Sequence, residues 1–173
     1  MKIKSFEMLK PLLIAISTDI HAKFYNVNHG GCGVFANIVA KQLRKHYCGV
    51  FEIKVANEYV DIEAPINYVI DELGLKSLKQ WNDNDIVCRH IVLVFDEGSK
   101  RTMTMFDSEG VDNIKRTVML NPHEWYAGSL TLKQLDDIAS KKSGWNDTFD
   151  RAQIPEMKIC IKKIFKDYLA KLA

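Results

Sequence analysis

The sequence has no long apolar run, no closely spaced pair of cysteines and no excess of charge of one sign. No stretch reaches the ~20 consecutive apolar residues that a transmembrane helix needs, so we expect no membrane partner. The four cysteines lie far apart, which argues against a disulfide framework and favours a cytoplasmic chain with reduced thiols. A formal charge of +2 gives no electrostatic reason to expect a nucleic-acid partner.

Internal repeats, low-complexity tracts and Pro-, Gly- or Ser-rich linkers are also missing. We therefore predict one domain over residues 1–173. With 47% hydrophobic and 27% charged residues, the chain has the balance of a globular protein that buries a core. The apolar N-terminal segment ends at Asp19 without a small-residue cleavage pattern, which indicates a core helix rather than a signal peptide.

Motifs for metals and cofactors are missing too. His29, Cys32, His46 and Cys48 are the nearest candidates for zinc ligands, but they would lie at both ends of one helix, some ~20 Å apart. The glycines around Cys32 lack the spacing and the Lys-Ser/Thr ending of a phosphate-binding loop. We expect no metal and no cofactor.

Apolar residues recur at helical spacing near both ends of the chain. A first helix is predicted to begin near residue 10, because Pro11 would be tolerated only in a first turn. A second helix follows the loop 26–33, and a terminal helix is predicted from about Ile154 to Leu172. We expect the terminal helix to dock through one apolar face, with a basic helix that binds a membrane or a partner as the alternative. That apolar face consists of Ile159, Ile161, Ile164, Phe165, Tyr168, Leu169 and Leu172.

The middle of the chain alternates at period two, as strands do. A short strand is predicted over residues 50–56, followed by a helix over 62–75. Three β-rich runs separated by turn-forming stretches then predict an antiparallel meander. These runs are "IVCRHIVLVFDEG", "RTMTMFDSEG" and "KRTVML". Thr131 is the predicted cap of a helix that ends before Gly144, and the order of helices, sheet and helices predicts an α+β domain.

Four aromatic residues fall in stretches that we interpret as polar loops. They either line a cleft beside the candidate site or pack the loops over the sheet. They are Trp125, Tyr126, Trp145 and Phe149.

The stretch "NHGGCGVFAN" places Cys32 at the start of the predicted second helix. A thiol attacks only as the thiolate, and the free N–H groups and aligned peptide dipoles at a helix N-terminus favour negative charge. Gly30, Gly31 and Gly33 remove side chains around the sulfur and allow a tight turn. Cys32 is therefore a candidate nucleophile, and a small buried residue beside a turn is the alternative interpretation.

A thiolate needs a base, and His90 lies inside an apolar strand where an unpaired imidazole would be costly. Asp107 ends the next β-rich run, so a hairpin can bring its carboxylate beside His90 to orient the ring. His29 is a second candidate base, but it shares the nucleophile's loop and has no obvious carboxylate partner. Asp85 and Asp96 are alternatives to Asp107, at less well fixed positions near the strand ends.

Cysteine at a helix N-terminus, histidine on a strand and aspartate on the adjacent strand, in this order, resemble the papain-like cysteine enzymes. The histidine and aspartate on consecutive strands look most like the transglutaminase-like and NlpC-like branches. The resemblance runs from about Asn26 to Asp107. It implies a papain-like fold, with N-terminal helices packed on a small antiparallel sheet and further helices at the C-terminus. It also implies that Cys32 is the nucleophile, His90 the base and Asp107 the orienting group.

The resemblance further implies an oxyanion hole, made of the nucleophile's own N–H and a side-chain donor a few residues upstream. Asn26 and Asn28 are the candidates, and Asn26 has the papain-like spacing; a turn-forming role is the alternative for both. Gly33 stands where many relatives carry an aromatic residue or serine, which leaves the branch open. The compact spacing from Cys32 to His90 argues against a large peptidase with insertions.

The expected activity is hydrolysis of a peptide or amide bond through an acyl-thioester intermediate, on a peptide or another amide-containing substrate. Transfer of the acyl group to an amine is one alternative. A non-catalytic α+β binding module, in which Cys32 is structural, is the other.

Overall fold

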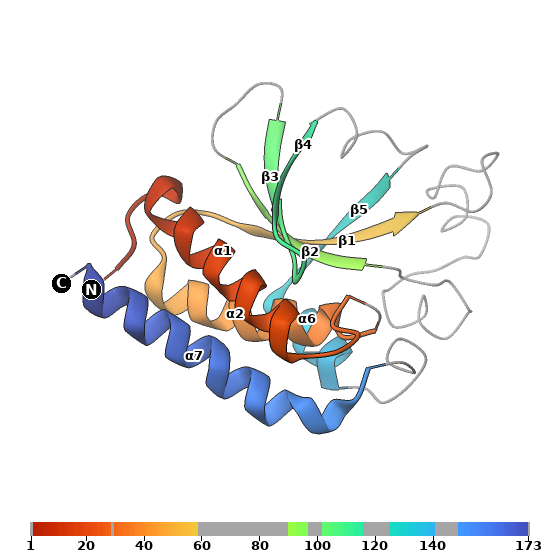
Figure 1. Ribbon diagram of the computed structural model, residues 1–173. Helices are drawn as coiled ribbons and strands as arrows, with labels where there is room; N and C mark the ends of the chain where they lie inside the picture. Colours follow the sequence, from red (N-terminus) through yellow and green to blue (C-terminus); the bar gives the residue numbers. More distant parts are fainter. Residues whose placement is uncertain are drawn as a thin grey trace, which may run out of the picture.

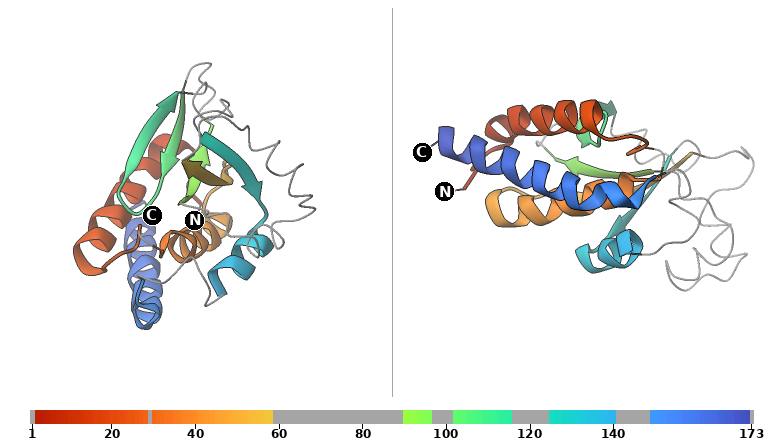
Figure 2. Two further views of the ribbon diagram at one scale, coloured as in Figure 1. Left: turned by 90° about the vertical axis from the view of Figure 1, so that its right-hand side faces the viewer. Right: turned by 60° about the horizontal axis from the view of Figure 1, so that its bottom comes forward.

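The helices and the sheet form two layers. The computed structural model describes residues 2–28, 30–58, 90–96, 102–115, 125–140 and 149–172. Within these residues the helices gather on one side of a five-stranded antiparallel sheet, and the two ends of the chain lie close together (Figures 1 and 2). This is the α+β class that the sequence predicts. The helices are α1 (Phe6–Lys23), α2 (Cys32–His46), α6 (Leu132–Ser140) and α7 (Ile154–Lys171), with a short 3₁₀-helix η1 (Arg151–Gln153); the strands are β1 (Glu52–Glu58), β2 (His90–Phe95), β3 (Thr102–Phe106), β4 (Val111–Lys115) and β5 (Trp125–Leu130).

The strands β1 to β4 are neighbours in chain order, and β5 returns to the free side of β1, giving the order β4-β3-β2-β1-β5. The predicted meander is therefore correct in kind. The predicted connection before its last strand is wrong, because β4 occupies residues of that connection. The turn after β3 is short enough for Val111 to pair with Phe106, so the chain re-enters the sheet at once. Residues 116–120 and the predicted helix over 62–75 lie outside the described residues.

Strand β5 corrects a second expectation. The sequence predicts a polar loop at Trp125 and Tyr126, but they pair with Glu58 and Asn57 of β1. The ladder with β1 decides their backbone conformation, although the neighbouring polar residues indicate a loop. Trp145 lies outside the described residues.

Helix α1 begins earlier than predicted. It starts at Phe6, so Pro11 lies inside the helix rather than in its first turn. Ser5 provides the cap, since its side-chain oxygen accepts from the N–H of Met8 at 3.4 Å. Pro11 has no N–H to donate to the carbonyl of Glu7. Both residues are exposed, so that carbonyl can bond to water instead and the proline is tolerated.

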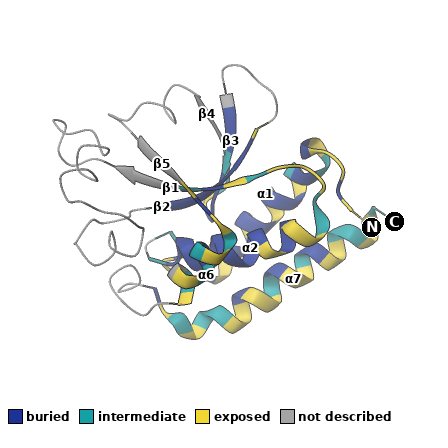
Figure 3. Ribbon diagram, turned by 180° about the vertical axis from the view of Figure 1, so that it is seen from behind, coloured by how far each residue is buried: buried dark blue, intermediate teal, exposed yellow. Residues whose placement is uncertain are grey.

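Helix α2 is the most enclosed helix of the structure. Every residue of it is buried except Lys41, Arg44, Lys45 and His46. It contacts β2 on one side and α6 and α7 on others, and the dark blue of Figure 3 runs along most of its length. The rings of Phe35 on α2 and Phe106 on β3 lie 5.6 Å apart, so the helix and the sheet share one core.

The terminal helix α7 has nearly the predicted bounds and docks on α1 and α2. Met157, Ile161 and Phe165 are buried, while the lysine side faces outward (Figure 3). Ile159 does not belong to the docked face as predicted, since it is 67% exposed. Among the described residues no helix is both long enough and apolar enough to cross a membrane.

Helix α6 begins with the predicted cap. The Oγ1 of Thr131 accepts from the N–H of Gln134 at 3.2 Å, and the Oε1 of Gln134 accepts from the N–H of Thr131 at 2.8 Å. Each residue thus satisfies a backbone donor of the other, which is the arrangement of a capping box. The predicted end of this helix at Gly144 lies outside the described residues.

We predict that Thr131→Ala lowers the free energy of unfolding by about 1 kcal/mol, because it removes the acceptor for the N–H of Gln134. Urea denaturation followed by circular dichroism measures this. Thr18→Ala, at an exposed position inside α1, is the matched control and should change stability by no more than about 0.5 kcal/mol. Equal effects in the two variants would contradict the capping role.

Candidate active site

Cys32 is the first residue of α2 and is almost enclosed, with 4% of its surface exposed. Its neighbour Gly31 is the N-cap, and no side chain forms a hydrogen bond there. The first N–H groups of a helix have no partner within the helix, so this end of α2 is a setting that favours an anion. The predicted position of the thiol at a helix N-terminus is confirmed.

The loop between α1 and α2 is held from the other end of the chain. Tyr25 and Gln153 exchange two hydrogen bonds, one from the N–H of Tyr25 to Oε1 at 3.0 Å and one from Nε2 to the carbonyl of Tyr25 at 3.4 Å. Phe149 is buried and lies against Gly31, where a Cβ atom would come within 2.6 Å of its ring. Phe149 therefore packs the loop, and glycine at position 31 leaves the space that its ring occupies.

His90 and Asp107 meet as the sequence predicts. His90 is the first residue of β2, and Asp107 directly follows Phe106, which pairs with Leu93 of β2. The Nε2 of His90 lies 2.8 Å from Oδ2 of Asp107. An imidazole has two ring nitrogens, and Nε2 is the one that binds Asp107.

A tight turn holds the carboxylate of Asp107. Its Oδ1 accepts from the N–H of Glu109 at 2.8 Å and from the N–H of Gly110 at 3.1 Å. The N–H of Asp107 donates to the carbonyl of Gly110 at 3.1 Å, which closes the turn. Gly110 has a φ of 154°, a backbone conformation that favours glycine. One carboxylate oxygen thus orders the turn and leaves the other for His90.

The pKa of His90 depends on both Cys32 and Asp107. Burial lowers the pKa of His90, but the hydrogen bond to Asp107, hydrogen bonding to Cys32 and the charges of both outweigh burial and raise this pKa to about 9. Burial raises the pKa of Asp107, but its interactions with His90 and with the turn N–H groups lower this pKa by more. The pKa of Asp107 therefore lies below the ordinary 3.8. The imidazolium is therefore the form of His90 that this site favours at neutral pH.

The two candidate oxyanion donors lie in different settings. Asn26 is exposed and has a φ of 55°, as residues in tight turns do. Asn28 is half-buried, and its Oδ1 accepts from the hydroxyl of Ser108 at 2.6 Å. Ser108 itself is buried and follows Asp107 in the turn. Sequence reasoning missed Ser108, because no local pattern signals a partner 80 residues away.

Two other residues that the sequence analysis considers lie far from the site. Asp96 follows the far end of β2, roughly 20 Å along the strand from His90. His46 ends α2, about 20 Å along the helix from Cys32, and its ring lies 6.0 Å from that of Phe165. His29 and Asp85 lie outside the described residues. The described residues include no group of three or more His, Cys, Asp or Glu side chains that could hold a metal.

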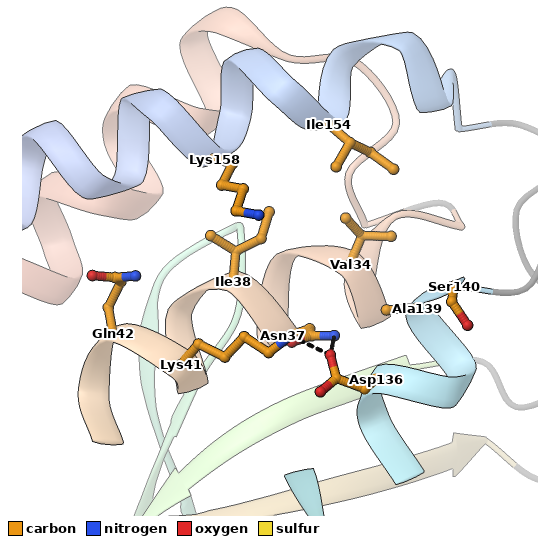
Figure 4. Close-up of a pocket in the computed structure, with 10 residues that line it drawn as sticks. All are labelled: Val34, Asn37, Ile38, Lys41, Gln42, Asp136, Ala139, Ser140, Ile154 and Lys158. Atoms are coloured by element: carbon orange, nitrogen blue, oxygen red, sulfur yellow. Dashed lines mark hydrogen bonds and ion pairs between the residues drawn. The ribbon is translucent and has the colours of Figure 1, made fainter. Parts of the chain in front are cut away.

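A cavity of about 190 Å³ lies between α2, α6 and α7 and is lined by none of the three candidate catalytic residues. Figure 4 shows Asn37 and Lys41 of α2 meeting Asp136 of α6 at its wall. The Nδ2 of Asn37 donates to Oδ1 of Asp136 at 2.8 Å, and Lys41 forms an ion pair with the same oxygen. These contacts join α2 to α6. Because none of the three candidate catalytic residues lines the cavity, we assign it no part in the chemistry at Cys32.

No protein-family model, curated protein or solved structure matches the chain. The geometry of the site is therefore the basis for proposing a function.

We predict that Asp107→Asn lowers the pKa of His90 by about 1 to 3 pH units, because it removes a carboxylate that favours the imidazolium while burial still opposes it. The raised pKa of His90 stabilises the fold fully below pH 6.5, and this contribution is lost as the pH rises through about 9. NMR titration of the His90 ring measures the pKa. Asp112→Asn, an exposed carboxylate on β4, is the control and should leave the titration unchanged.

We predict that Gly31→Ala lowers the free energy of unfolding by roughly 1–3 kcal/mol, because the new methyl group would overlap the buried ring of Phe149. In a Phe149→Ala background the same change should cost little, since the ring is gone. Urea denaturation of the four proteins of this double-mutant cycle gives the coupling energy. A cost that is equal in both backgrounds would show that the ring does not require glycine.

Proposed function

We propose that the protein is a cysteine hydrolase of papain-like type that cleaves a peptide or amide bond. One observation carries the proposal. His90 interacts with both Cys32 and Asp107, and the cysteine is the first residue of a helix. A base in contact with a nucleophile and oriented by a third group is the arrangement that recurs in enzymes that transfer acyl groups. The three residues come from α2, β2 and the turn after β3, so local sequence alone does not explain their meeting.

Each residue has a role in the proposed reaction. The thiolate of Cys32 attacks the substrate carbonyl carbon, and the carbonyl oxygen takes the negative charge. The His90 imidazolium gives its proton to the leaving amine as the C–N bond breaks, which leaves an acyl thioester on Cys32. His90 then takes a proton from water, the resulting hydroxide attacks the thioester, and the carboxylic acid leaves as the thiolate re-forms. Asp107 holds the imidazole in place and stabilises its charged form.

The burial of the three side chains is consistent with this chemistry. The side chains of His90 and Asp107 are 16% and 12% exposed, and Cys32 is the most enclosed of the three. Water is largely kept from the triad, which strengthens its electrostatic interactions. A partly exposed imidazole can still exchange a proton with water in the second step.

Selective alkylation tests the proposal. We expect iodoacetamide at pH 6 to modify Cys32 faster than the exposed Cys48, although Cys32 is far more buried. The reason is that the thiolate is the reactive form, and both an imidazolium partner and a helix N-terminus favour negative charge on the sulfur. Peptide mass spectrometry after timed quenching gives the rate at each cysteine.

Two histidine variants test whether His90 activates Cys32. His90→Ala should slow the modification of Cys32 by about 100-fold at pH 6. His46→Ala, which removes a histidine at the distant end of α2, should leave the rate unchanged. Modification of Cys32 no faster than that of Cys48 in the unaltered protein would refute the activated thiolate and favour a structural cysteine.

A further inference from the structure

One turn of the chain holds both a triad residue and a link to the nucleophile's loop. Asp107 uses Oδ1 to order the turn and Oδ2 to bind His90. The next residue, Ser108, is 3% exposed and donates its hydroxyl to Oδ1 of Asn28 at 2.6 Å. Asn28 precedes Cys32 on the loop that leads into α2. The hydrogen bond therefore connects the base side of the site with the nucleophile side.

The hydrogen bond also determines which atoms of the Asn28 side chain can bind a further group. A carboxamide has one acceptor oxygen and one NH₂ group with two donors. Since Oδ1 accepts the buried hydroxyl, the side chain is held in one orientation and its Nδ2 is available as a donor. Asn26 differs in burial, because it is exposed whereas Asn28 is half-buried.

We infer that Ser108 is a positioning residue, whose hydroxyl orients the carboxamide of Asn28 so that Nδ2 donates to the oxyanion formed at Cys32. This inference rests on the proposed function and extends it to the choice of oxyanion donor. Ser108 does not touch the substrate. It acts through Asn28, and its place beside Asp107 keeps the donor and the base in fixed relation.

Two reagents separate this role from general damage to the site. Acylation of Cys32 by p-nitrophenyl acetate passes through a tetrahedral oxyanion, whereas alkylation by iodoacetamide displaces iodide without one. Asn28→Leu removes the N–H donor without adding charge, so acylation should slow by about 100- to 1,000-fold. Ser108→Ala leaves the Nδ2 donor of Asn28 in place but removes the hydrogen bond that orients it, so acylation should slow by roughly 10- to 100-fold. Alkylation of Cys32 should keep its rate in both variants.

Asn26→Gly is the matched control, because glycine accepts the φ of 55° and removes only the carboxamide. It should leave both rates unchanged. Normal acylation in Ser108→Ala or Asn28→Leu, a parallel loss of alkylation, loss of acylation in Asn26→Gly, or no acylation of the unaltered protein would overturn the inference. If Cys32 of the unaltered protein is alkylated no faster than Cys48, the proposed function itself fails, so the two failures are distinguishable.

Discussion

The burial of α2 is the constraint on which the rest of the site depends. This helix lies between the sheet and the helices α6 and α7, and its sides are buried along most of its length. A helix enclosed in this way cannot slide or rotate without opening voids in a close-packed core. Its first residue therefore has one position relative to β2, and that position brings Cys32 to His90.

Two connections then complete the site from opposite sides. The loop before α2 is tied down by Gln153 and by the ring of Phe149, which lies where a side chain at Gly31 would be. The turn after β3 is ordered by the carboxylate of Asp107, which accepts two backbone N–H groups. Both connections are held by contacts made before any substrate binds, and such preorganisation is what a catalytic site requires.

Local periodicity and capping residues predicted part of the fold correctly. Thr131 and Gln134 form their capping box, and the terminal helix has nearly the predicted bounds. Errors arose where solvent exposure or tertiary contacts outweigh local preference. Pro11 lies inside α1 because the carbonyl that it leaves without a donor is exposed, and Trp125 joins a strand because β1 offers it a partner. The partner strand of Trp125 cannot be identified from the neighbouring residues.

The sequence by itself determined the α+β class, the placement of Cys32 at a helix start, and the pairing of His90 with Asp107 across a hairpin. These follow from short-range rules, because a hairpin brings together residues that are close in the chain. Only the tertiary structure decided that Cys32 meets His90 and that Ser108 bonds to Asn28. Both contacts join residues far apart in sequence, and their formation depends on how α2 packs against the sheet, which no local pattern encodes.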